Sequence, residues 1–211
     1  MRKLATGLLA ALIIAGTAHA QIGGDSYQFI KAVKDRDVLK AREIVDHPGS
    51  TIVNTRDAES GLTGLHMVTR DRDLGWMQFL LQEGADPNAR DKNGETPLIT
   101  AADQRFLEGA KLLLALRADV DATNRSGETA LIKAVQNHDA PMVRLLTENG
   151  ANADKTDNVA GLSARDYAKQ DRRSTMIARI LEEGKAGNAQ SAASFSITPK
   201  RAPDSVPPPK P

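Results

Sequence analysis

The sequence contains no cysteine, and only 3% of its 211 residues are aromatic. Without cysteine the chain can form neither a disulfide bond nor a thiolate metal site, so its fold must be held by packing alone. The few aromatic side chains leave little for a platform on which bases or sugars could stack. The 28 basic residues are balanced by 27 acidic ones, so the excess of positive charge that nucleic-acid binding requires is missing. We therefore expect no nucleic-acid partner.

Side chains with the spacing of a catalytic or metal site are also missing. His47, His66 and His138 lie far apart, and none has a histidine, cysteine or carboxylate at ligand spacing. The glycines that precede the expected helices stand singly, without the Gly-Lys-Ser/Thr sequence of a phosphate loop. We expect no catalytic residues, no cofactor and no bound metal, and hence a chain that is not an enzyme.

The first twenty residues have the pattern of a secretory signal peptide. A basic start, Met1-Arg2-Lys3, is followed by an apolar run from Leu4 to Ala15 and by the small residues of Ala18-His19-Ala20. The apolar run is shorter than the ~20 residues that a membrane span needs. We expect cleavage after Ala20, a periplasmic or secreted mature chain, and no stable membrane insertion after that cleavage.

A short phrase recurs at a fixed period in the middle of the chain. Gly94-Glu95-Thr96-Pro97-Leu98 returns as Gly127-Glu128-Thr129-Ala130-Leu131, and more loosely as Gly61-Leu62-Thr63-Gly64-Leu65. Thr63, Thr96 and Thr129 are each 33 residues apart. A period between 20 and 50 residues is typical of repeat proteins that stack one small structural unit on the next.

The sequence pattern of each repeat unit predicts two helices. The threonines are suited to capping a first helix, and in the fourth unit Ser163 takes their place. A second helix follows, for example from about Leu74 to Gln82, and ends near Gly84. In the second unit Arg117 occupies the position that Gly84 occupies in the first. The backbone at this position is expected to be left-handed, which is unfavourable for a residue other than glycine. Between units, Asp91-Lys92-Asn93-Gly94 predicts the tip of a short β-hairpin finger.

The Gly-x-Thr-Pro-Leu helix start, the Leu-Leu-rich second helix and the Gly-Ala-Asp-x-Asn ending resemble the ankyrin repeat over about residues 25–184. The resemblance implies an all-α fold, an α-solenoid of helix-turn-helix pairs with short β-hairpin fingers. It also implies that His66 braces its loop together with the capping threonine, and so has a structural role. Ile99, Ile132 and Arg165 occupy the histidine position in the other units.

This register divides the chain into seven parts. They are a signal peptide (1–20), an N-terminal capping repeat with its loop (21–57), three ankyrin repeats (58–90, 91–123 and 124–156), a C-terminal capping repeat (157–184) and a disordered proline-rich tail (185–211).

Ankyrin-like solenoids offer a long concave surface made of finger tips and first helices, and the resemblance implies an unknown protein partner bound there by a monomer. The residues that the register places on this surface are Leu62, Arg70, Lys92, Asn93, Glu95, Asp103, Gln104, Arg125, Ser126, Glu128, Gln136 and Asn137. Most of them are polar, and any one of them can be simple solvated surface. Leu62 and the apolar group Val159, Ala160 and Leu162 stand out because exposed apolar residues need cover. Alternating charges along the fingers further predict ion pairs between neighbouring fingers, formed by Arg56, Asp57, Arg90, Asp91, Lys92 and Arg125.

Three functions fit this pattern. The first is a non-catalytic protein-interaction scaffold in the periplasm or outside the cell. The second is a secreted effector that acts on a host protein, and the third is an accessory subunit of a stress-response enzyme. The proline-rich tail would serve as an inert linker, a tether, or a weak ligand for a proline-binding groove or a cell-wall polyanion.

Overall fold

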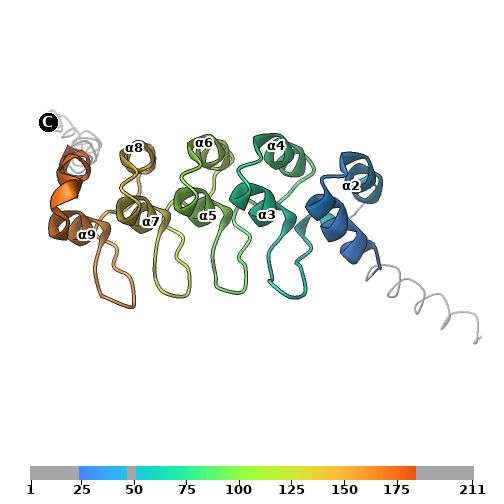
Figure 1. Cartoon of the computed structure of the whole chain (residues 1–211), viewed down its shortest axis with the longest axis horizontal. Coiled ribbons are helices and arrows are strands. Elements are labelled where there is room, and N and C mark those ends of the chain that lie inside the picture. Colours follow the sequence, from blue (N-terminus) through green and yellow to red (C-terminus); the bar gives the residue numbers. More distant parts are fainter. Residues whose placement is uncertain (1–23, 47–50, 184–211) are drawn as a thin grey trace, which may run out of the picture.

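The computed structural model describes residues 24–46 and 51–183, so the predicted signal peptide and tail lie outside the described residues. The described chain is a row of paired helices (Figure 1). Helical residues 24–35 and 175–183 begin and end it. Between them lie α2 (Val38–Val45), η1 (Ile52–Asn54), α3 (Gly64–Arg70), α4 (Leu74–Gln82), α5 (Pro97–Asp103), α6 (Leu107–Ala115), α7 (Ala130–Gln136), α8 (Ala140–Glu148), α9 (Ala164–Gln170) and η2 (Arg172–Ser174).

The helices form two rows. The first helices α3, α5, α7 and α9 lie side by side, and the second helices α4, α6 and α8 form a parallel row above them (Figure 1). The loops that join consecutive units project from the first-helix row, on the side away from the second helices. The all-helical prediction is confirmed for the described residues.

The helix starts follow the predicted capping. The side chains of Thr96 and Thr129 accept the backbone N–H groups of Ile99 and Ile132, and Pro97 occupies the first turn, where its missing N–H has no cost. Ser163 forms a capping box with Asp166. These side chains satisfy backbone donors that would otherwise remain unpaired at each helix start.

A single apolar core runs the length of the array. Equivalent leucines of successive first helices, Leu65, Leu98 and Leu131, are at most 1% exposed. They pack with residues of the second helices such as Leu80 and Leu113. Burying one such side chain contributes about 1.5–3 kcal/mol, so each unit depends on its neighbours for much of its stability.

The predicted short β-hairpin fingers are not shown as strands in the described residues. In place of strands, the described residues have isolated antiparallel bridges, Arg56 with Thr63, Thr123 with Thr129 and Thr156 with Ser163. Side-chain hydrogen bonds take over the role of a ladder: the Asp91 carboxylate accepts the N–H groups of Asn93 and Glu95, each at 2.8 Å. The fingers are therefore loops folded around an acceptor side chain.

Arginine is found at several positions where the backbone is left-handed. Arg117 has a φ of 62° at the end of α6, as its place in the repeat predicts, where Gly84 has 88°. The turns between first and second helices also have a positive φ at Arg72, Arg105 and His138. Such backbone costs a non-glycine residue about 1–2 kcal/mol, so these turns hold strain that packing must offset.

A repeated hydrogen bond joins each unit to the next behind the fingers. Side-chain oxygens of Asn54, Asn88 and Asp121 accept the backbone N–H groups of the residues 31 or 32 positions further on, at 2.7–2.8 Å. These bonds fix the spacing of neighbouring loops, and with it the positions of the fingers.

Candidate interaction face

The finger face is the side of the array that carries the loops and the exposed parts of the first helices. All twelve residues predicted for the concave surface lie on these elements, six exposed and six half-buried. The exposed residues are Arg70, Lys92, Asn93, Asp103, Arg125 and Gln136, and the half-buried residues are Leu62, Glu95, Gln104, Ser126, Glu128 and Asn137.

His66 braces the first finger against the second, as its place in the repeat predicts. Its ring is 0% exposed, with Nδ1 2.9 Å from the Thr63 hydroxyl and Nε2 3.0 Å from the Glu95 carbonyl oxygen. Nε2 therefore carries the proton that is donated to Glu95, and Nδ1 accepts from Thr63. Burial lowers the pKa of His66, so the ring is neutral at pH 7.

Carboxylates gather around Glu95 at the centre of the finger face. Burial raises the pKa of the Glu95 carboxyl, and the nearby Asp91 and Asp103 carboxylates raise it further, while Lys133 opposes them. Within the described residues Lys133 forms its ion pair with Glu128, at 2.8 Å, and Glu95 forms none. The negative charge at Glu95 is therefore not fully compensated by the fold.

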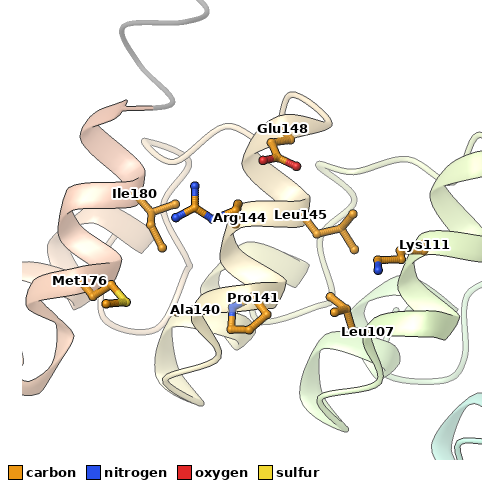
Figure 2. Close-up of a pocket in the computed structure, with 9 residues that line it drawn as sticks. All are labelled: Leu107, Lys111, Ala140, Pro141, Arg144, Leu145, Glu148, Met176 and Ile180. Carbon is orange, nitrogen blue, oxygen red and sulfur yellow. The ribbon is translucent and has the colours of Figure 1, made fainter.

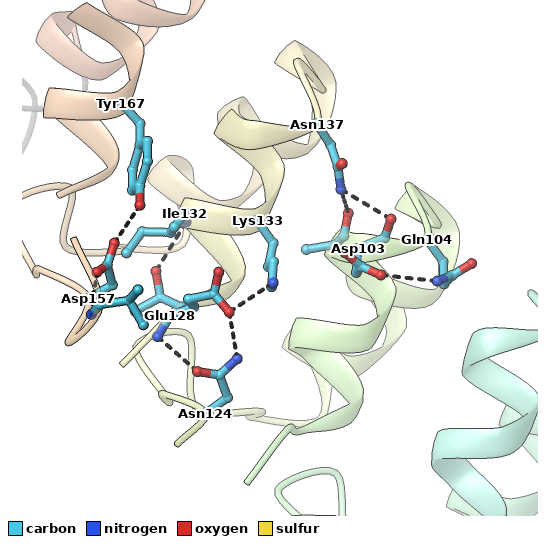
Figure 3. A network of polar contacts seen from close by, with 12 residues as sticks. Asp103, Gln104, Asn124, Glu128, Ile132, Lys133, Asn137, Asp157 and Tyr167 are labelled. Atoms are coloured by element: carbon cyan, nitrogen blue, oxygen red, sulfur yellow. Dashed lines mark hydrogen bonds and ion pairs between the residues drawn. The ribbon is translucent and has the colours of Figure 1, made fainter. Parts of the chain in front are cut away.

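Glu128, by contrast, has close partners inside the chain. Its carboxylate accepts hydrogen bonds from Asn124 at 2.9 Å and from Lys133, and the Glu128 and Lys133 side chains are each only 19% exposed (Figure 3). Burial disfavours the charged form of Glu128, but these two partners outweigh it and lower the pKa. Part of the finger face is thus a network fixed in place before any partner arrives.

Further bonds extend this network to both sides. The Asn137 amide donates to the backbone carbonyl of Asp103 at 3.1 Å, which joins α7 to α5 (Figure 3). On the other side, the Tyr167 hydroxyl donates to the buried Asp157 carboxylate at 2.7 Å. Its hydrogen bond to Asp157 raises the pKa of Tyr167. The face is continuous from α5 to α9.

The predicted ion pairs between fingers are not found. Within the described residues Arg56, Arg90, Lys92 and Arg125 form no ion pair. The fingers are joined through backbone carbonyls instead: Lys92 Nζ donates to those of Ala58 and Glu59, and Arg90 donates to that of Thr123. A carbonyl lies at every finger position whatever the sequence, whereas a carboxylate must be placed there by a side chain.

This geometry divides the predicted residues by role. Lys92, Glu128 and Asn137 hold the fold together, and Leu62 packs partly against the core. Asp103, Arg125 and Gln136 are exposed on the face. Sequence reasoning missed Lys133, the basic residue at the centre. A signal for it existed, because the same place in the two preceding units holds the uncharged Met67 and Thr100.

The described residues contain no group of three or more histidine, cysteine, aspartate or glutamate side chains that could hold a metal ion. Among the same residues, no helix combines the length and apolar character required to cross a membrane.

Comparison with known proteins assigns the chain to a family. A family model described as ankyrin repeats in many copies matches residues 53–101, 80–132 and 112–168, which together cover more than half of the chain. The chain therefore belongs to the ankyrin-repeat family. Ankyrin repeats generally mediate protein–protein interactions.

Individual relatives match over part of this chain. The human 2-5A-dependent ribonuclease is 38% identical over 78 residues, which cover 37% of this chain and 10% of that protein. The rice potassium channel AKT3 is 36% identical over 80 residues, 37% of this chain and 9% of the channel. A putative ankyrin repeat protein of Rickettsia felis is 36% identical over 58 residues, 26% of each chain. Since this chain spans about a tenth of the ribonuclease and channel, their activities are not carried over.

Proposed function

We propose that this chain is a non-catalytic scaffold that is exported from the cytoplasm and binds a protein partner through its finger face. The observation that carries the proposal is the face itself, a continuous polar surface contributed by successive ankyrin repeats. Bonds such as Lys133–Glu128 and Asn137–Asp103 hold its side chains in place, so little conformational entropy would be lost when a partner binds.

The charge of the face indicates the kind of contact that a partner would make. Glu95 is half-buried and unpaired by any cation among the described residues, and it lies near the Asp91 and Asp103 carboxylates. A lysine or arginine of the partner would find acceptors here, and charge-assisted hydrogen bonds are the stronger ones. Binding through such contacts weakens as the salt concentration rises.

A triple substitution on the face tests the proposal. Replacing Asp103, Arg125 and Gln136 by alanine removes exposed side chains without disturbing the Lys92 and Lys133 contacts. We expect unchanged thermal unfolding and at least tenfold weaker capture of the partner in a pull-down from the cell envelope. The matched control replaces Gln78, Gln82 and Glu108, which are exposed on α4 and α6. Equal capture by both triple variants would exclude the finger face as the binding site.

Export is tested separately. If the signal peptide is cleaved after Ala20, the purified mature chain should begin at Gln21 by intact mass, and cell fractionation should find it in the periplasm. Accumulation mainly in the culture medium would favour the secreted effector instead. A cytoplasmic chain that retains Met1 would contradict export altogether.

A further inference from the structure

An apolar groove lies on the opposite side of the array from the fingers. It has a volume of about 430 Å³ and is formed by α6, α8 and the last helix, residues 175–183 (Figure 2). Its lining is mostly apolar and includes Leu107, Leu145 and Met176. The Met176 side chain is 68% exposed, an unusual state for a large apolar residue at the edge of a groove.

The chain itself continues from the edge of this groove. Ile180 lines the groove, and Glu183, three residues later, is the last described residue. The following residues 184–211 contain three large apolar side chains, Phe195, Ile197 and Val206. Two of them fall in the alternating sequence Ser194-Phe195-Ser196-Ile197-Thr198, so an extended backbone would place both on one side, about 7 Å apart.

The connecting segment has a suitable length. Phe195 follows Gly184 by eleven residues, and a linker of that length would have an average end-to-end distance of about 18 Å. Neighbouring packed helices lie about 8–10 Å apart, so the groove across three helices extends over about 20 Å. A tether of matching length gives an effective concentration on the order of millimolar, which allows weak apolar contacts to form within one molecule.

The groove lining carries charges of both signs, the cations Lys111 and Arg144 and the carboxylate Glu148. The docking sequence 194–198 is uncharged, and Lys200 and Arg201 follow it. Glu148 lies at one end of the groove and forms no ion pair within the described part of the chain (Figure 2). Its carboxylate would therefore be free to accept a hydrogen bond from either cation once the apolar pair is in place.

We propose that residues 194–198 dock in this groove, with Phe195 and Ile197 against Ala140, Met176 and Ile180. The contact covers the exposed Met176 and holds the last helix against α8. It lies on the far side of the array from the finger face, so it does not depend on the proposed partner binding.

Two introduced cysteines test the docking, because the natural chain has none that could interfere. Ala140→Cys places a thiol in the groove, and Ala193→Cys places one on the same side of the extended segment as Phe195 and Ile197. The control adds F195S and I197S to this pair, which leaves the thiols and the tether unchanged. Circular dichroism and thermal unfolding show that both chains are folded.

We expect the A140C/A193C chain to form its internal disulfide at least threefold faster than the control, at a rate independent of protein concentration. Equal rates in the two chains would show that the tether alone brings the thiols together, and would overturn the proposal. A rate that rises with protein concentration and yields covalent dimers would assign the groove to a second copy, and would also overturn it. In the cysteine-free chain, amide hydrogen exchange of residues 140–148 and 175–183 should be slower than in the F195S/I197S variant, and equal exchange would contradict the docking.

Discussion

Replacing His66 by isoleucine tests the role assigned to the buried histidine. Isoleucine is the residue that the chain itself places at this position in the next two units, as Ile99 and Ile132. The substitution removes the contacts of the ring with Thr63 at 2.9 Å and with the Glu95 carbonyl at 3.0 Å. Each such hydrogen bond contributes about 1 kcal/mol net, and burial of the isoleucine side chain offsets part of the loss. We expect H66I to be about 1–2 kcal/mol less stable than the natural chain at pH 7.5.

The dependence on pH gives the sharper test. Burial lowers the pKa of His66 in the folded chain below its ordinary value of 6.5, so the unfolded chain takes up a proton first as the pH falls. A proton on Nδ1 would also face the Thr63 hydroxyl and N–H, which approach this nitrogen as donors. The stabilising contribution of His66 is therefore complete above pH 6.5 and is lost as the pH falls below it.

Urea unfolding at pH 7.5 and pH 5.0, followed by circular dichroism, measures this difference. From pH 7.5 to pH 5.0 the natural chain should lose more free energy of unfolding than H66I does. The stability advantage of the natural chain over H66I should therefore shrink or reverse at pH 5.0. Other titrating groups are common to both chains and cancel in the comparison. A parallel loss in both chains would refute the claim that a neutral His66 ring joins the two fingers.

Four further substitutions test the packing by urea unfolding. A Cβ at Gly109 would lie 2.4 Å from the Phe106 ring, so G109A should lower the free energy of unfolding by about 1–3 kcal/mol. A Cβ at Gly75 meets no atom closer than 3.7 Å, so G75A should raise it by about 0.5 kcal/mol. Destabilisation of both variants by the same amount would contradict this packing. Arg105→Gly should stabilise by about 0.5 kcal/mol, because φ is 52° there, and a loss of stability would mean that the arginine side chain has an essential contact. Arg165→Met should cost about 1–2 kcal/mol, because it removes two ion pairs of 2.8 Å at the C-terminal end of the array, and an unchanged stability would show that these pairs contribute nothing.

The helices could be predicted because each start is encoded locally. Thr96 and Pro97 specify a helix N-terminus by their own chemistry, and the period of 33 residues repeats that signal along the chain. The left-handed backbone at Arg117 was also predictable, since its place in the repeat is that of Gly84. Such features depend on few neighbours in sequence, and a fixed period reduces the remaining choices.

The side-chain contacts between units were harder to predict. Lys92 was expected to be free on the surface or paired with a carboxylate, but it donates to two backbone carbonyls of the preceding finger. The expected β-hairpin fingers are not shown as strands, and the Asp91 side chain accepts two of the finger N–H groups there. A repeat pattern specifies the position of the backbone, while several acceptors compete for each side chain at similar energy.

The central claim, that the finger face binds a protein, is tested most directly by photocrosslinking in living cells. A benzophenone amino acid at Asp103 or Gln136 reports on the finger face, and the same probe at Gln78 or Glu108 reports on the opposite row of helices. All four positions are exposed. We predict a common crosslinked protein at Asp103 and Gln136 that is missing at Gln78 and Glu108. Crosslinks of equal yield at all four positions, or at the second helices alone, would contradict the account.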